Sequence, residues 1–176
     1  MKPATLMTAF LFFSLFATVA SAATWIVDPG GGGDFLSIQS CSSSAVVQGD
    51  TCVVEPGEYI ENLDFQGKNI AVRSSSGPAA TTIDGNQVDS VVRFESGETS
   101  GAVLDGFMIR NGVGTPYGGG IFCENASPTV TNCILRDNAS ENGGGMIPPP
   151  DELVNSMGIL LIPLAGLLLL RRLKRT

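Results

Sequence analysis

The sequence predicts an all-β fold, a short right-handed parallel β-helix of about three to four coils with an N-terminal capping helix and a separate C-terminal apolar helix. The chain of 176 residues contains 22 Gly and 10 Pro, which disfavour a helical bundle because both break helix interiors. Residues 23–146 alternate short β-prone runs with Gly, Asn, Ser and Asp turns. Two motifs in this region recur at nearly the same interval, which indicates stacked coils.

The repeats set the length of one coil. Gly118–Ile121 returns as Gly143–Met146, and Gly106–Asn111 returns as Asn132–Asp137, so the two motifs share nearly one period. Asn and Gly suit the corners of such a coil, because both accept the left-handed backbone of a tight turn. Leucine-rich repeats have a similar period, but their Leu/Asn consensus is missing here.

The first element is expected to be a secretory signal over residues 1–22. Lys2 gives a positive start, Leu6–Ala20 is the apolar run, and Val19–Ala22 ends it with small residues at the cleavage spacing. The mature chain should then begin near Ala23 or Thr24, in an oxidising compartment. An uncleaved N-terminal membrane anchor is the alternative.

The β-helix domain should occupy residues 23–146. We expect a capping helix over Phe35–Ser43, with Asp34 as its N-cap. The expected strands are Trp25–Val27, Cys52–Glu55, Asn69–Arg73, Thr81–Asp84, Ser90–Phe94, Phe107–Arg110, Gly120–Cys123 and Thr129–Arg136. In the last two repeats, Phe107 and Ile109 should face the core, with Cys133 and Leu135 stacked on them, because alternate strand residues face opposite sides.

Residues 147–176 form a tripartite end. A Pro-rich break over residues 147–152 begins with Ile147, Pro148, Pro149 and Pro150. Residues 153–170 are an apolar stretch at the lower limit for a transmembrane helix. Residues 171–176 begin with the basic pair Arg171 and Arg172. The basic end should lie in the cytoplasm. This arrangement resembles the C-terminal sorting signals of bacterial surface proteins, the PEP-CTERM group, although the motif itself differs. The resemblance implies membrane tethering until an unidentified sorting protease acts; a permanent anchor is the alternative.

The domain itself resembles the pectin-lyase-like right-handed β-helix proteins over about residues 24–145. The entry segment Trp25–Gln39 carries the likeness, followed by Gly49–Asn62, Thr82–Asn86 and Gly119–Cys123. The resemblance implies the fold. For function it implies only a choice among polysaccharide lyases, esterases, epimerases and inert surface proteins.

Known activities of that family find little support in these residues. The chain has no His and no Asp-Asp pair, which polygalacturonases need, and it lacks the downstream motif that carries the carboxylates of pectin methylesterases. Calcium, which pectate lyases use, requires clustered ligands. The available acids are Asp64, Asp84, Asp89, Asp105 and Asp137, most of them at turn positions. We expect turn-forming roles for them, and neither a metal nor another cofactor.

The arginines offer a second candidate site. Arg73, Arg93, Arg110 and Arg136 each end a β-prone run, and Arg110 and Arg136 are repeat-equivalent. A groove for an anionic sugar is one interpretation, and strand ends paired with Asp or Glu are the other. Nucleic acid is not an expected partner, because residues 23–145 carry five Lys/Arg against fifteen Asp/Glu, a balance of −10.

Four cysteines in an exported chain suggest disulfides. The simplest of three connectivities joins Cys41 to Cys52 and Cys123 to Cys133, but Cys133 aligns with the core residue Phe107 and is also a candidate buried free thiol. Zinc is not expected, because the chain has no Cys-x-x-Cys spacing and no His.

The sequence therefore predicts an exported, surface-directed β-helix with a structural or polysaccharide-interaction role and no recognisable catalytic site. The alternative is a polysaccharide lyase or epimerase, or a truncated remnant of one. No capping segment is evident after Asn138. We thus expect the last layer, near Ile134 and Leu135, to be exposed and to need a partner.

Overall fold

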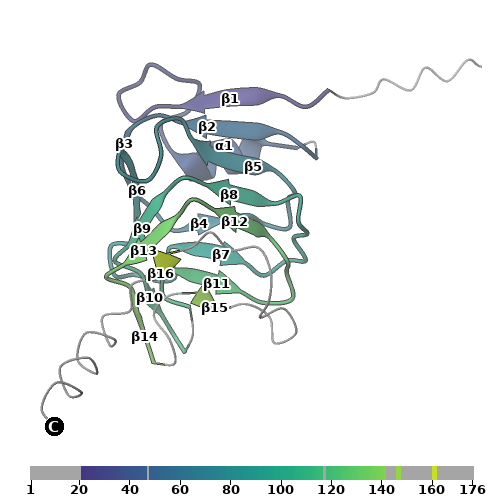
Figure 1. Ribbon diagram of the computed structural model, residues 1–176. Coiled ribbons are helices and arrows are strands. Elements are labelled where there is room, and N and C mark those ends of the chain that lie inside the picture. The colour runs from purple at the N-terminus through teal and green to yellow at the C-terminus, as the bar shows by residue number, and fades with distance from the viewer. Residues whose placement is uncertain (1–20, 47, 117, 142–145, 148–159, 162–176) are drawn as a thin grey trace, which may run out of the picture.

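The computed structural model describes residues 21–46, 48–116, 118–141, 146–147 and 160–161. The chain winds into a right-handed parallel β-helix of about four turns with one short helix. Figure 1 shows the strands stacked as rungs, with the N-terminal turn at one end and the C-terminal turn at the other.

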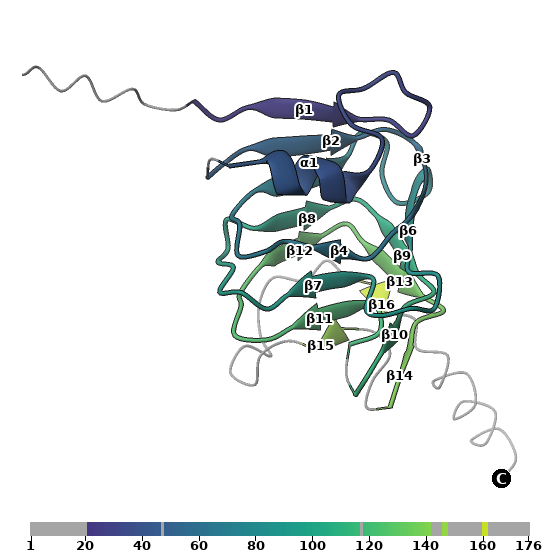
Figure 2. The same cartoon turned by 180° about the vertical axis from the view of Figure 1, so that it is seen from behind.

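Three parallel sheets form the walls. Sheet A consists of β1 (Thr24–Val27), β2 (Thr51–Val54), β5 (Ala71–Ser74), β8 (Val103–Asp105) and β12 (Thr129–Thr131). Sheet B consists of β3 (Gly57–Ile60), β6 (Thr81–Asp84), β9 (Met108–Arg110), β13 (Ile134–Arg136) and β16 (Leu160–Leu161). Sheet C consists of β4 (Leu63–Asp64), β7 (Val92–Phe94), β11 (Ile121–Cys123) and β15 (Met146–Ile147). A smaller pair, β10 (Val113–Gly114) and β14 (Ala139–Ser140), extends from the later turns (Figure 2).

The sequence repeats correspond to the pairing register between successive turns of the solenoid. Ile121 pairs with Met146, and Ile109 pairs with Leu135, so each residue lies beside its equivalent in the next copy of its motif. Parallel stacking places repeat-equivalent side chains above one another, so a periodic sequence yields continuous ladders.

The core ladders follow the predicted alternation. Ile83, Ile109 and Leu135 are stacked inside sheet B and are at most 2% exposed, whereas Met108 and Ile134 are half-buried on its outer surface. Phe107 and Cys133 are buried as expected. Two Phe rings also stack: the ring centroids of Phe65, which follows β4, and Phe94 in β7 lie 4.4 Å apart.

One predicted strand was wrong. Residues 129–136 form β12 and β13, which belong to different sheets, because Asn132 between them has a φ of 52°. An asparagine accepts this left-handed conformation and thereby turns the chain from sheet A into sheet B.

The helix also differs from the prediction. Helix α1 (Ile38–Ser44) has Ser37 as its N-cap, and the Ser37 side chain accepts the N–H of Ser40. It occupies the sheet C position of the first turn, beside β4 (Figure 2): the Gln39 side chain exchanges hydrogen bonds with the backbone of Asp64, at 2.7 and 3.1 Å. Asp34, the predicted N-cap, instead accepts the N–H of Ile26 in β1 at 2.8 Å.

The predicted Cys41–Cys52 disulfide is confirmed, and it ties α1 to β2. A buried disulfide is typical of an oxidising, extracellular environment. Cys123 and Cys133 are buried free thiols. The simplest connectivity is therefore wrong for this second pair, and the free-thiol alternative for Cys133 agrees with the structure.

Removing the disulfide should lower stability. The bond closes a short loop between positions separated by 11 in the sequence, and in the chain-entropy model this contributes about 3 kcal/mol. We expect the double variant Cys41→Ala/Cys52→Ala to lose about that much free energy of unfolding in urea. A reducing agent should shift the wild-type midpoint toward that of the variant and leave the variant unchanged. Equal midpoints under non-reducing conditions would contradict the prediction.

Several predicted segments lie outside the described residues: residues 1–20 of the signal predicted at 1–22, Pro148, Pro149, Pro150, and the basic residues Arg171 and Arg172. Ile147, predicted to begin the break, belongs to β15. Of the predicted apolar helix, the structure describes only Leu160–Leu161, which form β16. No helix within the described part of the chain is long and apolar enough to cross a membrane.

Candidate binding face

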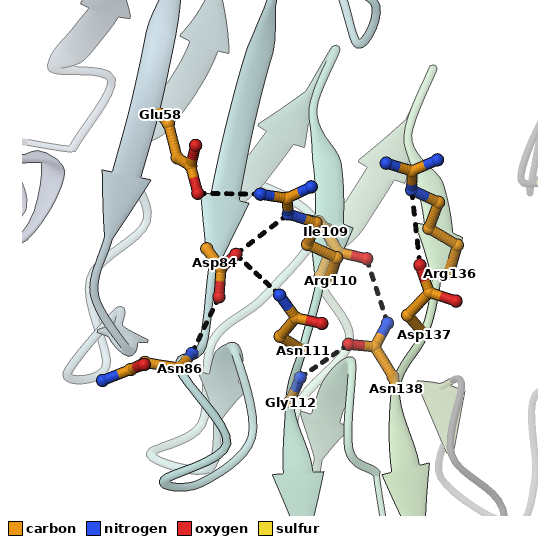
Figure 3. Close-up of polar contacts among 10 residues, drawn as sticks. All are labelled: Glu58, Asp84, Asn86, Ile109, Arg110, Asn111, Gly112, Arg136, Asp137 and Asn138. Carbon is orange, nitrogen blue, oxygen red and sulfur yellow. Dashed lines mark hydrogen bonds and ion pairs between the residues drawn. The ribbon is translucent and has the colours of Figure 1, made fainter.

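The outer surface of sheet B carries two rows of side chains, which we call the sheet B face. Alternation along each strand makes one row of Glu58, Thr82, Met108 and Ile134, and a second row of Ile60, Asp84, Arg110 and Arg136. The first row is largely apolar in the later turns, and the second is charged. Figure 3 shows the charged row and the asparagines beside it.

Asp84 is the centre of the charged row. Its carboxylate accepts hydrogen bonds from Arg110 Nε at 2.9 Å, from Asn111 Nδ2 at 2.7 Å and from the backbone N–H of Asn86 at 2.9 Å (Figure 3). Burial alone would raise the pKa of Asp84, but these donors outweigh it and hold the pKa below its ordinary value. Asp84 is therefore an ionised anchor and a poor general base.

The stacked arginines avoid mutual repulsion by pointing to different acids. Arg110 reaches back to Asp84 and donates from Nη2 to Glu58 at 2.8 Å, and these contacts raise its pKa. Arg136, its partner in register, lies 3.6 Å from Asp137 in its own turn (Figure 3). Arg136 is about half exposed, so its guanidinium is accessible to a ligand.

A hollow of about 550 Å³ adjoins the sheet B face on the side of its first row, next to Ile134. It is lined by Ser74, Gly77, Pro78, Asp105, Gly106, Asn132, Cys133 and Ile134. Asp105 is held by Arg73 at 2.6 Å, Asn132 at 2.8 Å and Thr131 at 3.1 Å. Ile134 belongs both to the hollow and to the apolar row, so the two surfaces are continuous.

The chemistry of these groups favours binding. Desolvation raises the pKa of Cys133 to about 11, which keeps the thiol protonated and unreactive at neutral pH. The carboxylates of Asp84 and Asp105 are both held by arginine and asparagine side chains. Within the described ranges, no group of three or more His, Cys, Asp or Glu lies close enough to hold a metal ion.

The sequence-predicted acids do not meet at one site: Asp84 and Asp89 lie in the same turn, and Asp64, Asp105 and Asp137 each lie in another. Asp64, Asp84 and Asp89 each accept a nearby backbone N–H, the turn-forming role that was predicted for them. Each of the four predicted arginines has an acidic partner. The pairs are Arg73–Asp105, Arg93–Asp89, Arg93–Glu95, Arg110–Glu58, Arg110–Asp84 and Arg136–Asp137.

Sequence reasoning missed several members of this surface. Glu58, Asn111 and Asn138 were not singled out, nor were Ser74 and Asn132. A usable signal was present, because Asp84, Arg110 and Arg136 follow one another at the interval of the repeat. Asn138 carries no such obvious mark: it accepts from the N–H of Gly112 at 2.9 Å and donates to Ile109 O at 3.0 Å (Figure 3).

Because the pKa of Asp84 is lowered in the fold, the stability of the protein should depend on pH. Its ionised form stabilises the fold above the unfolded pKa of 3.8, and this contribution is lost as the pH falls through the lower folded pKa. We expect Asp84→Asn to cost about 2 kcal/mol at pH 7 and progressively less as the pH falls through the folded pKa of Asp84. Urea unfolding of both proteins across this range measures the difference. Two parallel pH profiles would show that the charge of Asp84 contributes nothing.

No protein-family model matches the chain, and no match is found among the curated proteins. The function must therefore be argued from the face and the hollow themselves.

Proposed function

We propose that the chain is an exported, cell-surface-directed β-helix protein with a structural or polysaccharide-interaction role, and that the sheet B face with its hollow is the contact surface. The observation that carries the proposal is the repeating row of anchored charged groups beside an open hollow whose lining includes Ser74, Asp105 and Asn132. A polysaccharide presents hydroxyl groups at regular spacing, and a rigid solenoid presents one set of partners per coil.

Individual contacts on this surface fit a hydroxylated ligand. Asn132 is exposed at the rim of the hollow and offers an amide carbonyl beside the Asp105 carboxylate. Arg136 offers guanidinium N–H groups two residues beyond Ile134 on the same strand. Because the charged groups of the face are already paired, a neutral or weakly acidic polymer could lie across it without desolvating an unpaired charge.

Export and sorting belong to the same proposal. The signal at residues 1–22 would direct secretion, and an unidentified protease would act near Ile147–Pro150 while the apolar segment holds the chain at the membrane. The buried Cys41–Cys52 disulfide supports an extracytoplasmic location.

The competing function is a polysaccharide lyase or epimerase, or a remnant of one. An enzyme of this kind should bring three or more Asp, Arg or Lys side chains together in one groove. Glu58, Asp84 and Arg110 do meet, but Arg110 is already paired with both carboxylates, and the Asp84 side chain is only 8% exposed. This pairing favours the binding role.

The test uses the full chain with a panel of neutral and acidic polysaccharides. Affinity electrophoresis measures retardation, and the release of unsaturated or reducing ends measures cleavage. We expect retardation by at least one polymer, lost in Asn132→Ala/Arg136→Ala and kept in Gln48→Ala, an exposed control in the turn after α1. Release of ends would favour the enzyme instead. Retardation that survives the double variant would remove the sheet B face as the contact surface.

A further inference from the structure

The two ends of the solenoid are closed differently. The sequence predicts an exposed last layer at the C-terminal end, but Leu135 is only 2% exposed and pairs with Leu161. That prediction was wrong for Leu135, since β16 lies beside β13 in sheet B. At the N-terminal end, β1 is the edge strand of sheet A, and two carboxylates accept backbone N–H groups, one from β1 and one from the residue before it.

Asp50 is the buried one of these two acids. It directly precedes β2 and is only 1% exposed, and its Oδ1 atom accepts the N–H of Ala23 at 2.8 Å. Its Oδ2 atom accepts the N–H of Val46, just after α1, at 3.0 Å. The carboxylate therefore ties the start of the first rung to the segment that leads from the helix into β2.

Ala23 is the residue at which the chain joins the solenoid. Its carbonyl oxygen accepts the N–H of Thr51 at 2.8 Å, and the pairing continues from there with Thr24 beside Thr51. Ser21 and Ala22 are exposed, whereas Ala23 is half-buried. Parallel pairing with β2 thus begins at the same residue whose N–H is held by Asp50.

This junction coincides with the predicted end of the signal. The small residues of Val19–Ala22 predict cleavage after Ala22 or Ala23. Cleavage after Ala23 would remove both the donor to Asp50 and the acceptor of the Thr51 N–H. Cleavage after Ala22 keeps both: water adds across the peptide bond, Ala22 leaves as a carboxylate, and Ala23 keeps the amine. An α-amino group has an ordinary pKa of about 8, so at neutral pH it is mostly an ammonium group.

We propose that Asp50 is the receptor for the α-ammonium group of a mature chain that begins at Ala23, and that this ion pair fixes the first rung of the solenoid once the signal has been removed. The inference rests on the export part of the proposed function and is independent of polysaccharide binding. A hydrogen bond between ionised groups is about twice as strong as one between neutral groups, and a buried carboxylate meets little competing water. Because the amine forms only on cleavage, the precursor lacks the pair and the processed chain acquires it.

Asp34 provides a comparison within the same rung. Its Oδ2 atom accepts the N–H of Ile26 at 2.8 Å, the same length as the bond from Ala23 to Asp50. This N–H stays an amide whether or not the chain is cleaved. Asp34→Asn therefore removes a carboxylate that holds the backbone of β1 and leaves the proposed ion pair in place.

The experiment uses the full chain in a bacterial host that secretes it. The exported product is collected, its first residue is determined by N-terminal sequencing, and the rate at which cyanate labels the α-amino group at pH 7 is followed by mass spectrometry. Cyanate reacts with the unprotonated amine, and a neighbouring carboxylate favours the protonated form. We expect Ala23 to be the first residue and the wild type to label about tenfold more slowly than Asp50→Asn. Asp34→Asn should label like the wild type.

A second variant keeps the test valid if Asp50→Asn does not fold. One glycine inserted between Ala22 and Ala23 preserves Asp50 and the amide N–H of Ala23, but it moves the new amine one residue away from the carboxylate. Sequencing checks that the product begins at the inserted glycine. We expect this product to keep the wild-type circular dichroism spectrum, to label about tenfold faster than the wild type, and to unfold at a lower urea concentration.

The remaining outcomes separate this inference from export. A product that begins at Ala23 but labels as fast as the insertion variant would refute the ion pair and leave export intact. A product that begins at Thr24 would do the same, because it has no Ala23 amine. Fast labelling of Asp34→Asn would assign the protection to the fold of β1 instead of Asp50. A product that keeps Met1 would overturn both export and the ion pair.

Discussion

Ile109→Asp is expected to unfold the β-helix, while Met108→Asp, one residue earlier in the same strand, leaves it folded. Ile109 is fully buried in a ladder between Ile83 and Leu135. An aspartate there would place an unpaired charge among aliphatic side chains, and we expect a loss of about 5 kcal/mol. That is comparable with the total stability of a small domain, about 5–15 kcal/mol.

Met108 provides the matched control because it belongs to the outer row of the sheet B face. A carboxylate at this position keeps access to water, so the expected cost is about 1 kcal/mol or less. Circular dichroism and urea unfolding of both variants measure the contrast. If the two substitutions cost the same, the inward and outward assignment of sheet B is wrong, and with it the composition of the binding face.

The periodic part of the molecule could be predicted because a coil of nearly constant length repeats its pattern. The recurrence of Gly106–Asn111 as Asn132–Asp137 gives the register of β9 and β13, and through it the inward position of Ile109. The same interval links Asp84 to Arg110 and Arg136, so the charged row is also encoded as a repeat.

What could not be predicted depends on single residues that break the pattern. A run such as Thr129–Arg136 reads as one strand, and only the positive φ of Asn132 divides it. Aspartate is a common helix N-cap, so Asp34 is predicted to cap the helix. Its carboxylate instead accepts the N–H of Ile26 in β1. Apolarity alone predicts a membrane helix over residues 153–170, whereas Leu160–Leu161 pair with the edge of β13.

The corner after β9 is as sensitive to added volume as the core is to charge. Gly112 is buried where the chain turns between sheet B and sheet C, and its N–H donates to Asn138. A Cβ atom at this position would overlap the carbonyl oxygen of Gly119, and it would lie 2.7 Å from Val91 Cγ2 and 2.8 Å from the carbonyl carbon of Gly119. Two of these three atoms belong to the backbone, so no side-chain rotation can relieve the overlap.

Gly112→Ala is therefore expected to cost about 3 kcal/mol or more, because the backbone segments at Gly112 and Gly119 must separate. It should also break the hydrogen bond to Asn138 and so disturb the margin of the sheet B face. Gly30→Ala is the matched control, since its Cβ would approach only the flexible Asp28 side chain, at 3.2 Å, and should cost about 0.5 kcal/mol or less. Urea midpoints of the two variants test the argument. A Gly112→Ala protein as stable as Gly30→Ala would mean that the corners are looser than the close backbone approach at Gly112 and Gly119 implies.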